Sequence, residues 1–445
     1  MMNVLFKIGF VLSVVILLIT GYVIVIYRSD QVKDSQSVSY CYAQDPSPPK
    51  RFSTKTVYDF DKHRNTRKPT LPTNCKPVKL WTVIRHGIRL QQTDEVQSLQ
   101  NDLPKMQQEI VENYEKKTYK SGLCEQDFNN IRNWKLDSLV SVDNSFRLSD
   151  SGAQQMAELA DRFRRDYSSL FDFPCSDKNY LVHSFLNIGV TKSRNIFLDR
   201  IFNYTCSKNL KEISLVYDER FSSSMDFPEA DRFTETLLVQ EMLLNIGEKL
   251  GYNATRLNWT SVKLMYDMCR YDNAWQSNKL SPWCAVFTAE QNRLFEYHED
   301  LSCYYEYGYG NQNSKYVGCR MIKSMIYYFM DIASSELNEP KAILIFTHRG
   351  AMEALFVILN AKKDPYVLRG DNFEYATNRK WKTSDNIPFS AHVTVTFYSC
   401  DDNGKYVQFI LNEEPLELDF PGCVQGICPW QSVLLELRPA LLFCK

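Results

Sequence analysis

The sequence predicts an α/β protein in which a mixed central sheet carries helices on both faces and a helical domain covers its carboxyl edge. Two apolar runs, residues 80–84 and 342–347, are typical of buried strands, and each ends in a basic cluster. Residues 148–170 carry apolar side chains at helical spacing. Residues 205–337 have mainly helical patterns, so we expect them to form the domain over the sheet.

The first apolar run ends in Arg85-His86-Gly87-Ile88-Arg89. A buried strand does not carry such charges into a core, so this cluster should emerge at the carboxyl end, where α/β sheets form ligand crevices. Two nearby guanidiniums suit a phosphate group, and the imidazole between them can act as a nucleophile. Gly87 would let a ligand approach the backbone. A solvated basic turn is the alternative explanation of so short a motif.

The N-terminus predicts a membrane anchor. Residues 8–27 are uncharged and mostly Ile, Val, Leu or Phe, which is about the length that a helix needs to cross a bilayer. A cleaved signal peptide normally has a shorter apolar core, so we interpret residues 1–28 as an uncleaved signal-anchor, with secretion after cleavage as the alternative. Residues 29–75 are polar and contain several prolines, which is typical of a stalk and lead-in.

The cysteines indicate an oxidising compartment. All 13 lie beyond residue 40, and their wide scatter fits disulfides better than a zinc site. Cys75 and Cys400 each flank a core strand and are a candidate pair. The odd number leaves at least one thiol free or paired to another chain. Three glycosylation sequons support a position in the secretory lumen or outside the cell, at Asn203, Asn253 and Asn258.

The composition argues against one class of binding partner, nucleic acid. The 445 residues include 52 basic and 53 acidic side chains, so the chain lacks the basic excess of a nucleic-acid-binding protein. We therefore expect a small-molecule ligand rather than nucleic acid, and the sequence does not indicate an oligomeric state. Phe, Trp and Tyr make up 13% of the chain, which fits a well-packed globular protein.

The remaining elements follow from local patterns. Residues 91–146 are polar, with helical stretches near 95–117, and are expected as an insertion over the site mouth. Ser149 is a candidate N-cap for the next helix. Residues 180–185 predict a strand followed by a helix to about residue 202, and further strands are expected at 393–399 and 406–411. Four lysines of the insertion either face a polyanion or lie on a solvated helix face: Lys105, Lys116, Lys117 and Lys120.

The motif Arg85-His86-Gly-x-Arg89 after an apolar strand resembles the signature of the histidine acid phosphatases, a branch of the histidine phosphatase superfamily. Residues 148–152 resemble the start of a helix in the same family. Residues 281–290, 296–301 and 307–310 resemble the multiple inositol polyphosphate phosphatases rather than generic acid phosphatases. The resemblance spans about residues 70–430. It implies a histidine-phosphatase-like sheet in a domain over residues 76–430, with the helical cap mainly at 205–337 and a tail at 431–445.

The resemblance also implies the roles of the site residues. His86 would take the phosphoryl group as a phosphohistidine. His348, at the end of the second strand, would join the arginines as a cation that holds the phosphoryl oxygens. Arg85 and Arg89 would clamp the phosphate. Arg194 would be the third phosphate-binding arginine, at the start of the helix that follows residues 180–185. The resemblance implies no metal and no other cofactor.

Two positions depart from the family: Gln91 stands where the family usually has a proline, and the second departure bears on the chemistry. The family carries an acid after the second strand, which protonates the leaving oxygen, but this chain has His348-Arg349-Gly350. Glu353 is the candidate acid donor in its place, although one helical turn displaces this carboxyl by about 5 Å. We therefore expect a phosphatase of inositol polyphosphates, with a weakened or inactive anion-binding protein as the alternative. A phosphoglycerate-type mutase fits poorly with the anchor and the sequons.

Overall fold

The computed structural model describes residues 40–58, 74–116, 121–215, 227–253, 257–276, 279–330 and 340–444. The chain divides into two units, Met1–Cys41 and Tyr42–Lys445, and of the first only Tyr40 and Cys41 are described. The predicted signal-anchor therefore lies outside the described residues. Within the described ranges, no helix is both long enough and apolar enough to cross a membrane. All elements below belong to the second unit.

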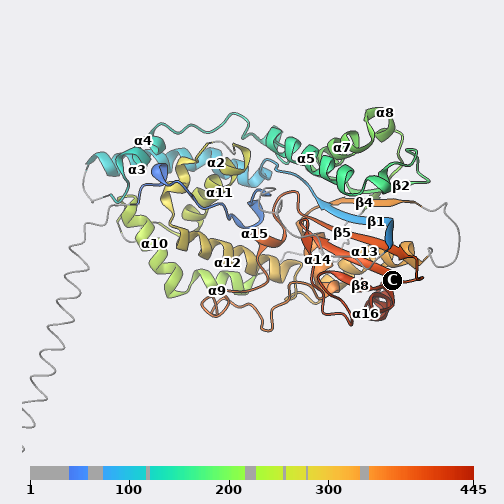
Figure 1. Cartoon of the computed structure of the whole chain (residues 1–445). Coiled ribbons are helices and arrows are strands. Elements are labelled where there is room, and N and C mark those ends of the chain that lie inside the picture. The colour runs from blue at the N-terminus through green and yellow to red at the C-terminus, as the bar shows by residue number, and fades with distance from the viewer. Residues whose placement is uncertain are drawn as a thin grey trace, which may run out of the picture. The chain divides into compact units, whose positions relative to one another are not determined.

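An eight-stranded mixed sheet, built from the described residues, crosses this unit in the order β3-β2-β4-β1-β5-β6-β7, with β8 paired to β6 (Figure 1). Strands β1 to β4 run parallel, and β5 turns the order antiparallel. Five of these strands were predicted from the sequence. The strands are β1 (Cys75–Arg85), β2 (Tyr180–Phe185), β3 (Glu212–Leu215), β4 (Ala342–Thr347), β5 (His392–Cys400), β6 (Lys405–Leu411), β7 (Glu414–Pro415) and β8 (Ile427–Pro429).

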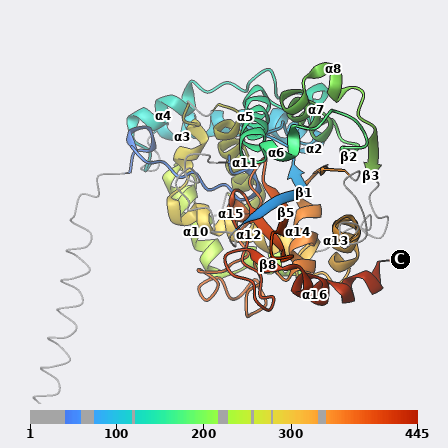
Figure 2. The ribbon, with the colours of Figure 1, turned by 45° about the vertical axis from the view of Figure 1, so that its right-hand side comes forward.

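Helices cover both faces of the sheet, as the sequence predicted (Figures 1 and 2). One face carries α5 (Asp150–Asp166), α6 (Ser168–Phe171), α7 (Ile188–Phe202) and α8 (Tyr204–Ser207). The other face carries α13 (Ser314–Met330), α14 (Arg349–Leu359) and α16 (Trp430–Phe443). Alternate residues of β1 serve the two cores: Leu80 packs with the α5 and α7 side, and Trp81 with the other.

A second group of helices lies beside the sheet (Figure 1). It contains α2 (Thr93–Asn101), α3 (Leu103–Lys116), α4 (Glu125–Arg132), α9 (Pro228–Thr234), α10 (Leu237–Lys249), α11 (Trp259–Trp275) and α12 (Ala289–Glu306). Short helices connect the larger elements: η1 (Tyr42–Gln44), η2 (Ser53–Lys55), η3 (Val142–Asn144), η5 (Pro282–Val286) and α15 (Thr383–Asn386). The expected cap is thus mainly helical, although β3 and α13 from the same span belong to the sheet layers.

The segments expected as lead-in and tail both pack against this unit. In the lead-in, Tyr42, Phe52 and Tyr58 are each only 3% exposed, so residues 42–58 are part of the fold and not a solvated stalk. At the other end, residues 431–443 lie in α16, where Val433 and Leu437 are buried. Apolar side chains explain both cases, because their burial outweighs the cost of ordering the chain.

Disulfides join cysteines across this unit, and one of them links Cys75 with Cys400, the pair expected from the sequence. This bond links the outer ends of β1 and β5, which are register partners. Cys303 is the free thiol in the described part of the chain, and it is buried. Further pairs are Cys175–Cys206, Cys269–Cys284, Cys319–Cys444 and Cys423–Cys428.

Candidate active site

Parallel pairing of β1 with β4 brings the two basic clusters together. Arg85 lies opposite Thr347, and the His86 backbone N–H donates to Thr347 O at 3.0 Å. His86 and His348 therefore leave the sheet side by side at its carboxyl edge. A cavity of about 360 Å³ opens there, lined by the two clusters, by η2 and by side chains of α11 and α12. A cavity of this size suits a small-molecule ligand.

His86 is held as a neutral imidazole. Its Nδ1 lies 2.9 Å from Gly87 O, and a carbonyl oxygen only accepts, so Nδ1 carries the proton. The Nε2 lone pair is then available for attack. Burial, followed by the charges of Arg85 and Arg89, holds the pKa of His86 well below its usual range. The imidazole therefore stays neutral in mildly acidic solution.

Gly87 serves the packing of α5 and not the approach of a ligand. A Cβ on Gly87 would lie only 2.7 Å from Gly152 O, and one on Gly152 would clash with the Ile88 backbone. Ser149 caps α5 as predicted, accepting from the Gly152 N–H at 3.0 Å, and its hydroxyl donates to Ile88 O at 3.1 Å. The two glycines thus let the first turn of α5 lie directly on the nucleophile loop.

Arg85 is fixed by backbone oxygens from distant segments. The residue is 2% exposed, and its Nη1 donates to Thr54 O at 2.7 Å and to Ile387 O. Its guanidinium lies 4.8 Å from the centre of the Phe389 ring. Burial, and then the charge of Arg89, lowers the pKa of Arg85 to about 9, so the side chain stays cationic at neutral pH. Such anchoring presents a positive charge with little reorganisation.

Arg89 lies beside the first turn of α7. Its guanidinium stacks 5.0 Å from the Phe146 ring centre and donates to Leu90 O at 2.7 Å. A Cβ on Gly189 would lie 3.3 Å from Arg89 Cδ, so the helix start and the arginine are adjacent. Asn187 caps α7 and lines the cavity. A helix N-terminus next to an arginine is a favourable place for a phosphate.

The structure does not bring Arg194 to this cavity. The helix begins at Ile188, six residues earlier, so Arg194 lies nearly two turns inside α7, about 9 Å from its start. Its guanidinium pairs with Glu212 of β3 and donates to Asn195 Oδ1. The helix was expected to start nearer Arg194; the Asn187 cap moves that start, and the arginine turns toward β3.

His348 directly precedes α14, at the N-cap position but without a side-chain capping hydrogen bond, and lines the cavity. Its ring centre lies 5.0 Å from that of Phe185 and 6.4 Å from that of Tyr307. Burial, and then the charge of Arg349, lowers the pKa of His348 to about 3. His348 is therefore a neutral hydrogen-bonding group above that pH and not a cation.

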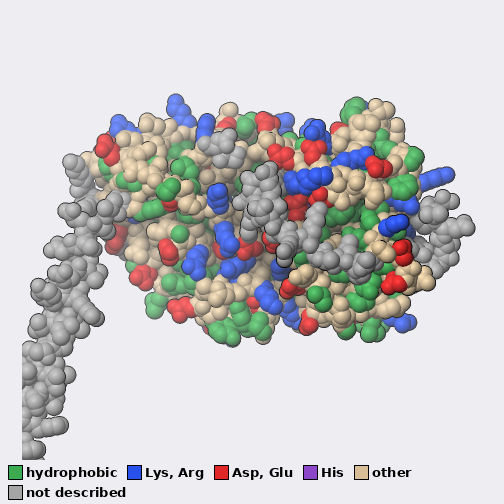
Figure 3. Space-filling view, in the orientation of Figure 1, with side chains coloured by type: hydrophobic (Ala, Val, Ile, Leu, Met, Phe, Trp, Pro, Cys, Tyr) green, Lys and Arg blue, Asp and Glu red, His purple; other side chains and the backbone are tan. Residues whose placement is uncertain are grey.

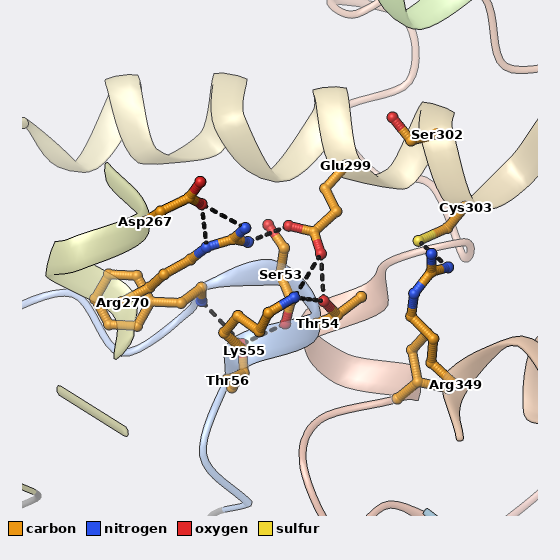
Figure 4. A network of polar contacts seen from close by, with 12 residues as sticks. Ser53, Thr54, Lys55, Thr56, Asp267, Arg270, Glu299, Ser302, Cys303 and Arg349 are labelled. Atoms are coloured by element: carbon orange, nitrogen blue, oxygen red, sulfur yellow. Dashed lines mark hydrogen bonds and ion pairs between the residues drawn. The ribbon is translucent and has the colours of Figure 1, made fainter. Parts of the chain in front are cut away.

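The lead-in reaches the cavity through η2. Lys55 lines the cavity, and its Nζ donates to Thr54 Oγ1 at 3.1 Å and lies 3.8 Å from Glu299. Thr54 Oγ1 donates to Glu299 as well. Figure 4 shows both lead-in side chains directed at this carboxylate of α12. Burial lowers the pKa of Lys55 to about 8, which leaves a cation at neutral pH.

The same carboxylate joins the lead-in to α11. Arg270 lies between Asp267 and Glu299, with its Nε 2.9 Å from Asp267 Oδ1 (Figure 4). Lys263 pairs with Asp267 at 2.7 Å and, like Arg270, lines the cavity. Although burial opposes ionisation, Arg270 and Lys55 hold the pKa of Glu299 well below its usual range. These ion pairs hold Lys55, Lys263 and Arg270 in place in the cavity lining.

Basic side chains therefore predominate around the cavity. Of its described lining residues, three are acidic: Glu95, Glu299 and Glu306. Six are basic: Lys55, Arg85, Arg89, Lys263, Arg270 and Arg349. On the face seen in Figure 3, by contrast, basic and acidic side chains are interspersed, in line with a net charge of -1. The cavity lining therefore has an excess of basic side chains that this face does not show.

The region around Gly350 contains carboxyls, but they are held by Arg349. Glu353 is fully buried, lies outside the cavity lining and sits 3.1 Å from Arg349 Nη1. Glu306, the last residue of α12, lines the cavity and pairs with Arg349 Nη2. Burial, opposed by the charge of Arg349, raises the pKa of Glu353 to about 7. The placement of Glu353 thus does not support the expected role of proton donor.

The described lysines of the insertion and the sequon asparagines lie on the surface. Lys105 pairs with Asp102 at 3.3 Å and Lys116 with Glu112 at 2.9 Å, and neither lysine lines the cavity. The other two lysines, residues 117 and 120, lie outside the described residues. The three sequon residues, Asn203, Asn253 and Asn258, are all exposed, which suits the predicted glycosylation.

Sequence reasoning missed three cations of the site: Lys55, Lys263 and Arg270. Lys55 was assigned to a stalk because its neighbours are polar. The spacing of Lys263, Asp267 and Arg270 places them on one face of a helix, and buried charges among aromatic residues such as Tyr266 were an available signal.

Known proteins are similar to this chain in sequence and in fold. The model of the histidine phosphatase superfamily (branch 2) matches residues 209–412. The chain is 30% identical over 417 residues to multiple inositol polyphosphate phosphatase 1 of Drosophila melanogaster, a match that covers 90% of this chain and 87% of that protein. It is 24% identical over 374 residues to the protein of the same name from Gallus gallus, covering 78% of each.

Solved structures show the same fold at lower identity. The phytase from D. castellii superposes with a TM-score of 0.66 at 18% identity, covering 84% of this chain and 81% of that one. The multiple inositol polyphosphate phosphatase of Bifidobacterium longum, solved with inositol hexasulfate, gives a TM-score of 0.61 at 14% identity and covers 86% of this chain and 96% of that one.

Proposed function

Because this chain belongs to the multiple inositol polyphosphate phosphatase family of the histidine phosphatase superfamily (branch 2), we propose that it hydrolyses phosphomonoesters of inositol polyphosphates. The observation that carries the proposal is His86, a buried neutral imidazole with an available Nε2 between two arginines. The six basic side chains of the cavity suit a ligand with several phosphates, of which only one reacts at a time.

The first step is transfer of a phosphoryl group to His86. Arg85 and Arg89 hold the phosphoryl oxygens, where charge spreads in the transition state. His86 Nε2 attacks the phosphorus and forms the N–P bond while the ester P–O bond breaks. His348, as a neutral donor, hydrogen-bonds the same group. Water then attacks the phosphohistidine and releases phosphate and the free imidazole.

The alternative, a family member that binds anions and turns them over weakly or not at all, keeps one specific support. Gly350 has no side chain, so the carboxyl that the family carries after the second strand is absent. Loss of a general acid slows such a reaction by about 10²–10⁴-fold. Turnover of substrates that need no proton at the leaving oxygen separates the two functions.

The disulfides are typical of a secreted or lumenal domain. We infer that residues 29–445 lie in the secretory lumen or outside the cell and that the signal-anchor over residues 1–28 holds them at a membrane. Cleavage of that segment would instead release the protein. Carbonate extraction of membranes separates the two states, because an anchored chain stays in the pellet.

The experiment that tests the function is phosphate release from inositol hexakisphosphate by the full chain and by its His86→Ala variant. We expect release by the parent and a fall of at least about 10³-fold in the variant, because the nucleophile is lost. Trapping of a phosphorylated intermediate on the parent and not on the variant is the second readout. Equal activity in both proteins would refute the proposal.

A further inference from the structure

The leaving oxygen of an inositol phosphate needs a proton, because an alkoxide leaves poorly. Position 350 offers none, so the donor must come from elsewhere in the cavity. Two of the lining carboxylates are committed to cations: Glu299 to Arg270 and Lys55, and Glu306 to Arg349. The third, Glu95, accepts the Gln92 N–H at 3.0 Å and the Tyr271 hydroxyl at 3.3 Å.

Tyr307 occupies the place of the missing side chain. A Cβ built on Gly350 would lie 2.7 Å from Tyr307 Cδ2, 2.8 Å from Cε2 and 3.0 Å from Cγ. The ring therefore stands on the Gly350 backbone, where a larger residue would begin. Tyr307 follows α12 directly and lines the same cavity as His86 and His348. The Tyr307 ring can therefore take this position only because residue 350 has no side chain.

We propose that the Tyr307 hydroxyl donates the proton to the leaving oxygen and replaces a carboxyl at position 350 as the general acid. The inference rests on the proposed phosphatase function. Burial raises the pKa of Tyr307 to about 12, so the hydroxyl keeps its proton throughout the acidic and neutral range. Arg349, which pairs with Glu306 and Glu353 beside it, supplies a positive charge near the phenolate that proton transfer leaves.

The proton balance closes over one turnover. In the first step the N–P bond to His86 forms, the ester P–O bond breaks and the Tyr307 proton passes to the leaving oxygen, which departs as an alcohol. In the second step water attacks the phosphorus, its proton passes to the Tyr307 phenolate, and the N–P bond breaks. Phosphate leaves, and both residues return to their first state.

The test compares two leaving groups in the Tyr307→Phe variant, which keeps the ring on Gly350. p-Nitrophenolate leaves without a proton because its charge is delocalised, whereas the alkoxide of glycerol 2-phosphate requires one. We expect kcat for glycerol 2-phosphate to fall by about 10²–10⁴-fold and kcat for p-nitrophenyl phosphate to change by less than about threefold. Tyr305→Phe is the matched control, since Tyr305 donates to Leu368 O at 2.7 Å and lies outside the cavity lining.

Three outcomes overturn the inference: equal loss on both substrates, no loss on either, or a leaving-group-selective loss in Glu306→Gln or Lys55→Met that is absent in Tyr307→Phe. A parent that hydrolyses p-nitrophenyl phosphate but not glycerol 2-phosphate also overturns it and leaves the phosphohistidine chemistry intact. A parent that hydrolyses neither refutes the proposed function itself.

Discussion

His86 acts as a nucleophile only while its imidazole is neutral, and the residues around it set that state. Burial disfavours the charged form, and Arg85 and Arg89 repel a further proton. His348 is neutral for the same reasons, since its pKa is lowered to about 3. Single side chains thus adapt the site to mildly acidic solution.

The acid limb of the pH profile follows from these shifts. Because the pKa of His86 lies well below 6.5, lowering the pH through that value does not protonate the nucleophile. We expect kcat/KM for p-nitrophenyl phosphate at about pH 5 to keep at least roughly half its value at pH 6.5, since this parameter reports the free enzyme. Arg89→Gln removes one repelling cation and should move the limb to higher pH. A parent limb centred at or above 6.5 would contradict the assignment.

Arg89 and Arg194 were both expected to bind the phosphate, yet of these two only Arg89 belongs to the described cavity lining. Arg89→Gln should lower kcat/KM by about 10²-fold, because a cation at the phosphoryl group is lost. Arg194→Gln should change kcat/KM by less than about threefold and lower the free energy of unfolding by about 1 kcal/mol, through the lost pair with Glu212. Kinetics and urea unfolding of both variants, measured in parallel, test this difference between the two arginines. Similar losses in kcat/KM would instead support the phosphate-binding role that the sequence predicted for Arg194.

At the scale of elements, the lead-in is a structural part of the site. Through Thr54 it accepts a hydrogen bond from Arg85 and donates one to Glu299 of α12. Arg270 links the same carboxylate to Asp267 of α11. The nucleophile strand and the helical region over the cavity are therefore held in register by one short segment that precedes β1.

A substitution of Lys55 tests whether the lead-in contributes to ligand binding. Lys55→Met should raise KM for inositol hexakisphosphate about tenfold or more, because the variant loses a cation that would hydrogen-bond a phosphate of the ligand. Turnover of p-nitrophenyl phosphate, which has only one phosphate, should change little. The same binding advantage should fade in the parent as the pH rises through about 8, the pKa of Lys55. Lys50→Met is the matched control: this lysine lies on the same lead-in, is exposed and is absent from the cavity lining. Equal changes in the two variants would argue against a role for Lys55 in the site.

At the scale of the whole molecule, disulfides close very different lengths of chain around one sheet. Cys75–Cys400 spans 325 residues and joins two central strands, whereas Cys423–Cys428 spans 5. Constraint of the unfolded chain grows with the length that a disulfide closes. The long-range bond should therefore carry more of the stability than the short one.

We expect the double variant Cys75→Ser, Cys400→Ser to lose about 2–5 kcal/mol in free energy of unfolding while its activity at room temperature persists. Cys423→Ser with Cys428→Ser is the control and should lose less. Thermal unfolding followed by circular dichroism measures both. An equal or larger loss in the control would show that chain entropy does not govern this difference.

The sequence by itself determined the sheet and the place of the basic cluster around His86. Apolar runs at 80–84 and 342–347 can be satisfied only by burial, so they became the parallel pair β1 and β4, and the charges that end them had to emerge at one edge. The Ser149 cap and the apolar face of α5 are equally local, because an amphipathic helix needs only its own spacing to be recognised. His86 and its two arginines follow from those same few residues.

Only the tertiary structure decided which distant residues complete the site. Lys55 and Arg270 are separated by more than 200 positions, yet both contact Glu299. The start of α7 at Ile188 turned Arg194 toward β3, and the packing of Tyr307 on Gly350 placed an aromatic ring where a larger side chain at 350 would begin. Such contacts depend on how whole layers pack, since burial is non-directional and local patterns do not say which buried faces will meet.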